Sequence, residues 1–167
     1  MTDLRRVYWD ANAWLGLINR EANKVRALEI VYEKAKKNDI EIWTSTISFA
    51  EVYKMKDDPA APRSLEEQNK IIAAVLEQQF VQLVEVNQII GMNARDLLQK
   101  HPALKKPYDA IHLASAAHWN LHALHTYDNV NLLPLNGQVK RRDGRVLEII
   151  KPDSDADGPL FGGGSGQ

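Results

Sequence analysis

Four acidic residues lie at points of the chain where a strand end or the start of a helix would present them together. They are Asp10, Glu51, Asp109 and Asp128. Crowded carboxylates repel one another and raise one another's pKa unless a cation neutralises them. A set of hard oxygen ligands without histidine or cysteine is typical of Mg²⁺ or Mn²⁺ sites. If the fold gathers these side chains, we therefore expect them to hold one or two divalent ions.

Each acid also has a purely structural explanation when it is taken alone. Asp10 fits an N-terminal helix cap, Glu51 fits a capping box, and Asp109 suits the positive end of a helix dipole. Asp128 fits a simple turn. For any single residue the structural explanation is favoured, so the prediction of a site depends on all four occurring at such positions.

The elements that must position these acids alternate between strands and helices. Strands are expected at residues 5–9, 41–44, 80–86 and 123–126. Helices are expected at residues 12–19, 24–37, 46–55, 64–78, 89–99 and 107–120. This alternation predicts an α/β fold, a three-layer α/β/α sandwich with a mainly parallel central sheet. Ligands bind such sheets at the carboxyl ends of the strands, where the four acids are expected.

The last part of the chain predicts two further features. Asp143-Gly144, between β-forming segments 138–142 and 145–150, indicates a C-terminal β-hairpin with a type I′ turn. Residues 151–167 are rich in Gly, Pro and Asp, and we expect them to form a flexible tail. Residues 1–150 would then form a single domain.

Composition sets limits without indicating a function. The chain has 167 residues, of which 44% are hydrophobic and 26% charged, and no cysteine, which favours a soluble, cytoplasmic protein without a membrane segment. The net charge of −1 does not mark a nucleic-acid binder, so phosphate affinity would need local patches or bound metal. Candidate patches are Lys54, Lys56, Lys105 and Lys106, which also fit an ordinary solvated surface.

Four motifs around the acids resemble those of the PIN domain family, in order and spacing over about residues 5–135. The first is Val7-Tyr8-Trp9-Asp10-Ala11-Asn12, and the second is the Thr44–Val52 segment ending in Ala50-Glu51-Val52. The third and most specific is Tyr108-Asp109-Ala110-Ile111-His112-Leu113-Ala114-Ser115-Ala116. The fourth is Leu124-His125-Thr126-Tyr127-Asp128. Ala11 and Ala13 depart from residues common in the family, but no acid is missing.

The resemblance implies a metal-dependent ribonuclease like the VapC-type toxins of bacterial toxin–antitoxin pairs. The four acids would be the catalytic, metal-binding residues, with Asn12 and Thr126 as supporting polar side chains. A metal-activated water would attack the phosphodiester of single-stranded or structured RNA. The resemblance also implies a small antitoxin partner and a homodimer.

Three alternatives stay open at this point. The domain could bind RNA or a protein without cutting, or it could be a small Mg²⁺-dependent phosphatase with Asp10 as nucleophile. The spacing of His118, His122 and His125 also suggests a zinc site, although the expected helix ends before the last two. His112 is expected to pack inside its helix rather than to take part in chemistry.

Overall fold

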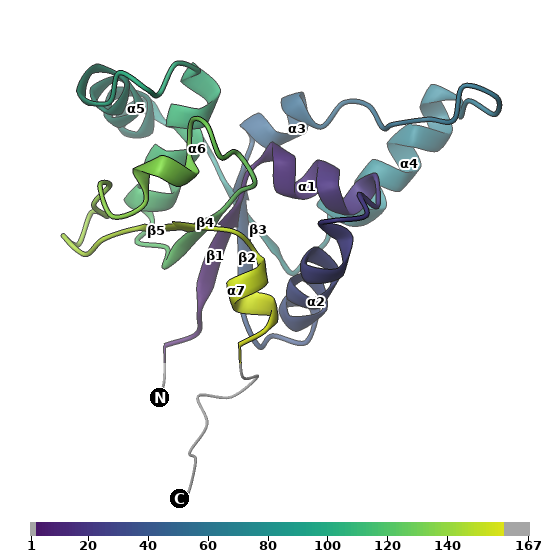
Figure 1. Ribbon diagram of the computed structural model, residues 1–167, viewed down its shortest axis with the longest axis horizontal. Helices are drawn as coiled ribbons and strands as arrows, with labels where there is room; N and C mark the ends of the chain where they lie inside the picture. The colour runs from purple at the N-terminus through teal and green to yellow at the C-terminus, as the bar shows by residue number, and fades with distance from the viewer. Residues whose placement is uncertain (1–2, 159–167) are drawn as a thin grey trace, which may run out of the picture.

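The computed structural model describes residues 3–158, which form a five-stranded sheet covered by helices (Figure 1). The strands are β1 (Arg6–Trp9), β2 (Glu41–Ser45), β3 (Val81–Val84), β4 (Ala123–His125) and β5 (Glu148–Ile150). Their order is β3-β2-β1-β4-β5, and every pair of neighbours is parallel. The α/β fold with a mainly parallel sheet is thus confirmed.

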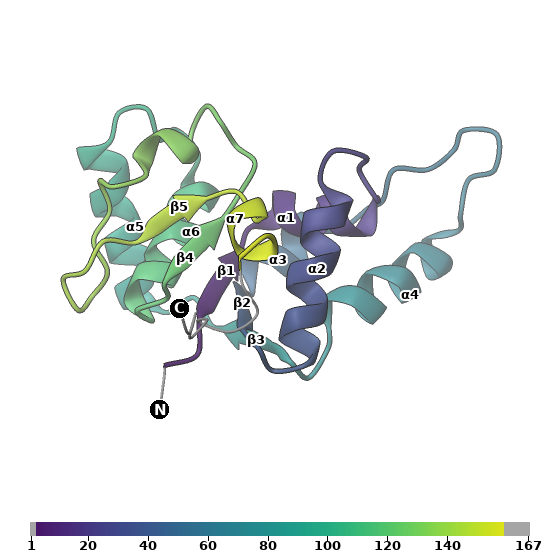
Figure 2. The same cartoon turned by 60° about the horizontal axis from the view of Figure 1, so that its bottom comes forward.

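Both faces of the sheet are buried. On β1, Val7 and Trp9 belong to one hydrophobic cluster and Tyr8 to the other, because successive side chains of a strand point to opposite faces. Two helices, α1 (Ala11–Ile18) and α2 (Val25–Lys36), cover the first face. The second is covered by α5 (Gln88–Lys100) and α6 (Pro107–His118), as Figures 1 and 2 show. No helix within residues 3–158 has the length and apolar character of a membrane span.

The helix after β2 is shorter than its sequence predicts. We expected residues 46–55 to be helical, whereas α3 spans only Ile47–Glu51. Side chains compete with the helix here: the backbone N–H of Met55 donates to Gln68 Oε1 and that of Lys56 to Asn19 Oδ1. The chain therefore leaves the helix immediately after Glu51.

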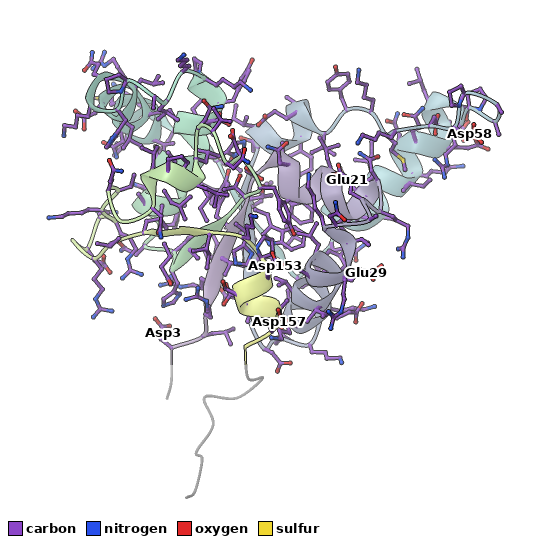
Figure 3. The ribbon with its side chains drawn as sticks, in the orientation of Figure 1. Asp3, Glu21, Glu29, Asp58, Asp153 and Asp157 are labelled. Atoms are coloured by element: carbon purple, nitrogen blue, oxygen red, sulfur yellow. The ribbon has the colours of Figure 1, made fainter. Side chains whose placement is uncertain are left out.

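A loop then leads away from the sheet to α4 (Leu65–Leu76). Asp58 marks the outer end of this loop in Figure 3. The helix begins with the expected capping box, in which Ser64 Oγ accepts from Glu67 N and Glu67 Oε2 accepts from Ser64 N. Only Ile72 and Leu76 of this helix are buried.

The expected C-terminal β-hairpin does not form as two paired strands. Lys140 and Val146 make one antiparallel bridge, and then β5 joins β4 in the parallel sheet. Among the described residues only Gly144 of the Asp143-Gly144 pair has a positive φ, whereas a type I′ turn needs two. The turn is instead a three-residue loop, one residue longer than a type I′ turn, closed by Gly144 N donating to Arg141 O and Arg141 N donating to Arg145 O.

Part of the expected tail is folded. A short helix, α7 (Asp153–Ala156), follows β5. Before β5, the chain also forms a 3₁₀ turn at Leu133–Leu135. Asp155 accepts from Arg5 Nε at 2.5 Å and lies 2.6 Å from His125 Nε2. The Trp9 indole donates to His125 Nδ1, so His125 must carry its proton on Nε2 and donate it to Asp155. Residues 159–167 lie outside the described part of the chain.

This contact predicts a pH-dependent contribution to stability. Burial alone would raise the pKa of Asp155, but the hydrogen bonds from His125 and Arg5 outweigh it and lower the pKa to about 2. An ordinary Asp has a pKa of about 3.9, so the stabilisation is present above pH 4 and lost as the pH falls towards 2. Asp155→Asn should lower the free energy of unfolding at pH 7 by about 1–2 kcal/mol.

Urea denaturation at pH 7 and pH 2.5 tests this, with the exposed Asp153→Asn on the same helix as the control. The difference in free energy of unfolding between Asp155→Asn and the unmodified protein should shrink at the lower pH. A deficit equal at both pH values would contradict the assigned ion pair.

Candidate active site

Asp10 is held between the two central strands of the sheet. Because Trp9 pairs with His125 in register, the next residues along the two strands, Asp10 and Thr126, lie side by side. Asp10 is buried, with Oδ2 accepting from the Thr126 hydroxyl at 2.6 Å and Oδ1 accepting from Ala13 N at 2.9 Å. The expected N-terminal cap is therefore real, and the same carboxylate also faces the carboxyl edge of the sheet.

Asp109 lies in the first turn of α6, close behind the Pro107 that begins the helix. Its Oδ2 is buried and has no hydrogen-bond partner among residues 3–158. Burial and the charge of Asp128 raise the pKa of Asp109 to about 6, and the charge of Asp10 adds to the effect. Three of the four predicted acids thus lie within electrostatic reach of one another.

The same surroundings also shift the pKa of the buried Asp10. Burial raises the pKa of Asp10, and the charge of Glu51 acts in the same direction. His112 and the hydrogen bonds from Thr126 and Ala13 N oppose this rise. The fold therefore concentrates negative charge at one edge of the sheet, with His112 beside it.

Glu51 ends α3 and makes a contact that the sequence did not predict. Its Oε1 lies 2.5 Å from Nε2 of His112, which is 1% exposed. His112 is three residues after Asp109 on α6 and therefore on the same side of that helix. We expected His112 only to pack, and this spacing from Asp109 was the available signal for a position at the site.

Asp128 is mostly engaged by its own turn. Its Oδ1 accepts from the backbone N–H groups of Val130 and Asn131, and Oδ2 accepts from the Asn131 side chain. Although burial acts to raise it, these hydrogen bonds lower the pKa of Asp128 below its ordinary value. The turn explanation is thus correct, while the effect of Asp128 on Asp109 also keeps it near the other acids.

The supporting residues differ in how closely they are tied to the acids. Thr126 donates to Asp10 and accepts from Asp128 N at 3.1 Å, so it connects two of them. Asn12 is exposed in the first turn of α1.

The four lysines are all exposed. Lys106 is close enough to act against the raised pKa of Asp109. Lys54 lies over the Tyr53 ring at 5.4 Å, and Lys56 lies 3.7 Å from Glu21, which Figure 3 labels beside α1. Lys105 adjoins Lys106. Only Lys106 is thereby tied to the acids.

The acids fit a divalent cation in chemistry, although their side chains do not converge on a single point. Within residues 3–158, no three acidic or histidine side chains are gathered closely enough to hold a metal ion. The fit comes instead from the buried Asp109 oxygen that lacks a partner and from the oxygen-only donors around it. A cation there would supply the missing contact and offset the repulsion that raises the pKa of Asp109.

The three histidines that suggested zinc are engaged separately. His122 Nδ1 accepts from Arg6 N, and His125 contacts Trp9 and Asp155 through its two ring nitrogens. His118 packs edge-on against Trp119. These contacts do not form a common site.

Comparisons with known proteins agree with the fold and the motif order. The PIN domain family matches residues 7–131. No curated protein sequence matches the chain.

Two solved complexes share the fold over most of both chains. VapBC2 from Rickettsia felis, bound to a promoter DNA fragment, has 16% identity and a TM-score of 0.58, covering 86% of this chain and 98% of its own. DNA-bound VapBC from Salmonella typhimurium has 16% identity and a TM-score of 0.55, and the match covers 87% of this chain and 98% of its own.

A third solved structure is VapC20 from Mycobacterium tuberculosis, described as a toxin that cleaves the sarcin–ricin loop. It has 15% identity and a TM-score of 0.55, and the match covers 73% of this chain and 89% of its own. At such identities these likenesses concern the fold alone, whereas the family match spans most of the chain. The chain therefore belongs to the PIN domain family.

Proposed function

We propose that this PIN domain is a metal-dependent endoribonuclease and the toxin of a toxin–antitoxin pair. The observation that carries the proposal is the buried Asp109 oxygen, which has no hydrogen-bond partner within residues 3–158, beside Asp10 at the carboxyl edge of the sheet. Family membership supports the nuclease, and the likeness to VapC20, a toxin described as cleaving an RNA loop, supports RNA as substrate. The two VapBC complexes support a small antitoxin as partner.

The four acids have two kinds of part in this proposal. A Mg²⁺ or Mn²⁺ ion held there would lower the pKa of a water and offset charge in the transition state of phosphodiester hydrolysis. Asp10 and Asp109 would hold the ion, and Glu51 and Asp128 would complete its surroundings directly or through water. Thr126 keeps Asp10 in its orientation, and Asn12 is a candidate for contact with RNA.

Lysines near the acids are candidates for binding the RNA backbone. Lys106 is favoured, because its charge already acts on Asp109, while Lys54, Lys56 and Lys105 would contact more distant phosphates. A homodimer, as the resemblance to VapC-type toxins implies, remains part of the proposal.

The two other functions fit the contacts less well. A phosphatase would need Asp10 as a nucleophile, but Asp10 is 2% exposed and both of its oxygens accept hydrogen bonds. A binding module without catalysis gains nothing from acids placed so close together, since without a cation the ionised Asp109, whose pKa is raised to about 6, costs stability at neutral pH. Hydrolysis by water needs neither an exposed nucleophile nor a neutral Asp109.

The first prediction from this proposed function concerns cleavage itself. Asp10→Asn and Asp109→Asn should each reduce cleavage of single-stranded RNA in Mg²⁺ by about 100-fold or more, because each removes a charged ligand. EDTA should abolish cleavage by the unmodified protein. Asp96→Asn, on the exposed side of α5, is the matched control and should cut normally. Full activity in EDTA, or in either site variant, would refute the proposal.

A second prediction concerns the stability of the metal-free protein. The pKa of Asp109 is raised to about 6, above the ordinary value of about 3.9, so its ionisation destabilises the fold as the pH rises from about 4 through 6. Asp109→Asn should therefore melt at a higher temperature than the unmodified protein at pH 7.5 in EDTA. The difference should vanish near pH 4. A variant that melts lower at pH 7.5 would show that the acids do not repel as described.

A third prediction separates the turn role of Asp128 from a role at the metal. Asn keeps the two hydrogen bonds that Oδ1 accepts from the turn backbone and removes the charge, and the Asn131 amide can turn its oxygen towards the new N–H, so Asp128→Asn should fold normally. It should need about 10–100-fold more Mg²⁺ for half-maximal cleavage and retain activity at saturating metal. Metal titrations of the two proteins decide this. Superimposable curves would assign Asp128 to the turn alone.

A further inference from the structure

A chain of buried hydrogen bonds runs from the sheet to Glu51. The Tyr8 hydroxyl, on β1, lies 2.9 Å from Ser45 Oγ on β2 and 2.5 Å from His112 Nδ1. The other ring nitrogen of His112, Nε2, lies 2.5 Å from Glu51 Oε1. Tyr8 and Ser45 are fully buried and His112 is 1% exposed, so solvent does not compete for these contacts.

Both ring nitrogens of His112 are used within the protein. Nδ1 faces Tyr8, and Nε2 faces a carboxylate oxygen of Glu51, to which we assign it as the donor. Neither nitrogen has room left for RNA or for a metal ion. Any influence of His112 on the reaction must therefore act through Glu51.

The backbone alone gives Glu51 little support. It is the last residue of the five-residue helix α3, after which the chain turns into an extended loop. The Glu51 side chain is still 25% exposed, so it could rotate into solvent if the histidine did not hold it. His112 lies on α6 together with Asp109. The imidazole thus fixes Glu51 to the helix that carries a second site acid.

We propose that His112 is a positioning residue that holds the Glu51 carboxylate beside the helix that carries Asp109, with Tyr8 and Ser45 fixing the orientation of the ring. The inference rests on the proposed metal-dependent function. Its consequence is that divalent-metal affinity depends on one N–H at the Nε2 position, although His112 touches no metal. Losing an outer partner of a ligand typically weakens metal binding by about 10–100-fold.

Two conservative variants separate positioning from packing. In His112→Gln the amide nitrogen can take the place of Nε2 and still donate to Glu51, whereas in His112→Asn it takes the place of Nδ1 and reaches only Tyr8. Both variants leave the ring pocket partly empty, so a packing role would affect them alike. Mn²⁺ affinity is measured without RNA, by electron paramagnetic resonance, with thermal melting as the check on folding.

We expect His112→Gln to bind Mn²⁺ within a few-fold of the unmodified protein and His112→Asn about 10–100-fold more weakly. His118→Gln, at the far end of the same helix, is the control and should bind as the unmodified protein does. Equal affinities for the Gln and Asn variants, weakened or not, would overturn the positioning role and leave the proposed function intact. Absence of Mn²⁺ binding by the unmodified protein would overturn both.

Discussion

Placing a carboxylate in the interior at the end of a central strand is unfavourable, and much of the site can be understood as compensation for it. Asp10 is almost completely buried, and a charge in such a position loses its hydration. The first turn of α1 returns one hydrogen bond through Ala13 N, and Thr126 returns another from the neighbouring strand. The parallel pairing of β1 with β4 is therefore also what orients the acid.

The C-terminal segment supports this pairing from the outside. Thr126 N donates to Ile150 O, so β5 holds the same residue whose hydroxyl contacts Asp10. α7 then returns to the sheet, where Asp155 contacts Arg5 and His125. The PIN match ends at residue 131, yet residues 148–156 brace the strand that leads into the site. The contribution of this segment to function would then be indirect, through the position of Thr126.

Structural features that depend on local sequence pattern could be predicted. Features that depend on contacts between residues far apart in the sequence could not. Strands and capped helices follow from local pattern, which is why the sheet, the capping box of α4 and the acids' positions at its edge were expected. The length of α3 depends on Asn19 and Gln68, and the folding of α7 on Arg5 and His125, which are remote in sequence. The Asp143-Gly144 pair predicted a turn correctly, but β5 pairs with β4, and the segment before the turn makes only one bridge to the segment after it.

The same distinction applies to the site. Single acids could be read from the motifs, but the contact between His112 and Glu51 joins segments 61 residues apart and appears only in three dimensions. That one Asp109 oxygen lacks a hydrogen-bond partner in the described part of the chain likewise cannot be seen in the sequence. The motifs predict which acids could form a site, and these two features show how the fold surrounds Glu51 and Asp109.

In the proposed function the acids direct water to the phosphodiester, and no side chain or ribose hydroxyl is the nucleophile. The most direct measurement is mass spectrometry of the RNA products after a single turnover in H₂¹⁸O with Mg²⁺. We predict one ¹⁸O atom in the new terminal phosphate and no 2′,3′-cyclic phosphate. Products ending in a 2′,3′-cyclic phosphate without ¹⁸O would contradict the claim.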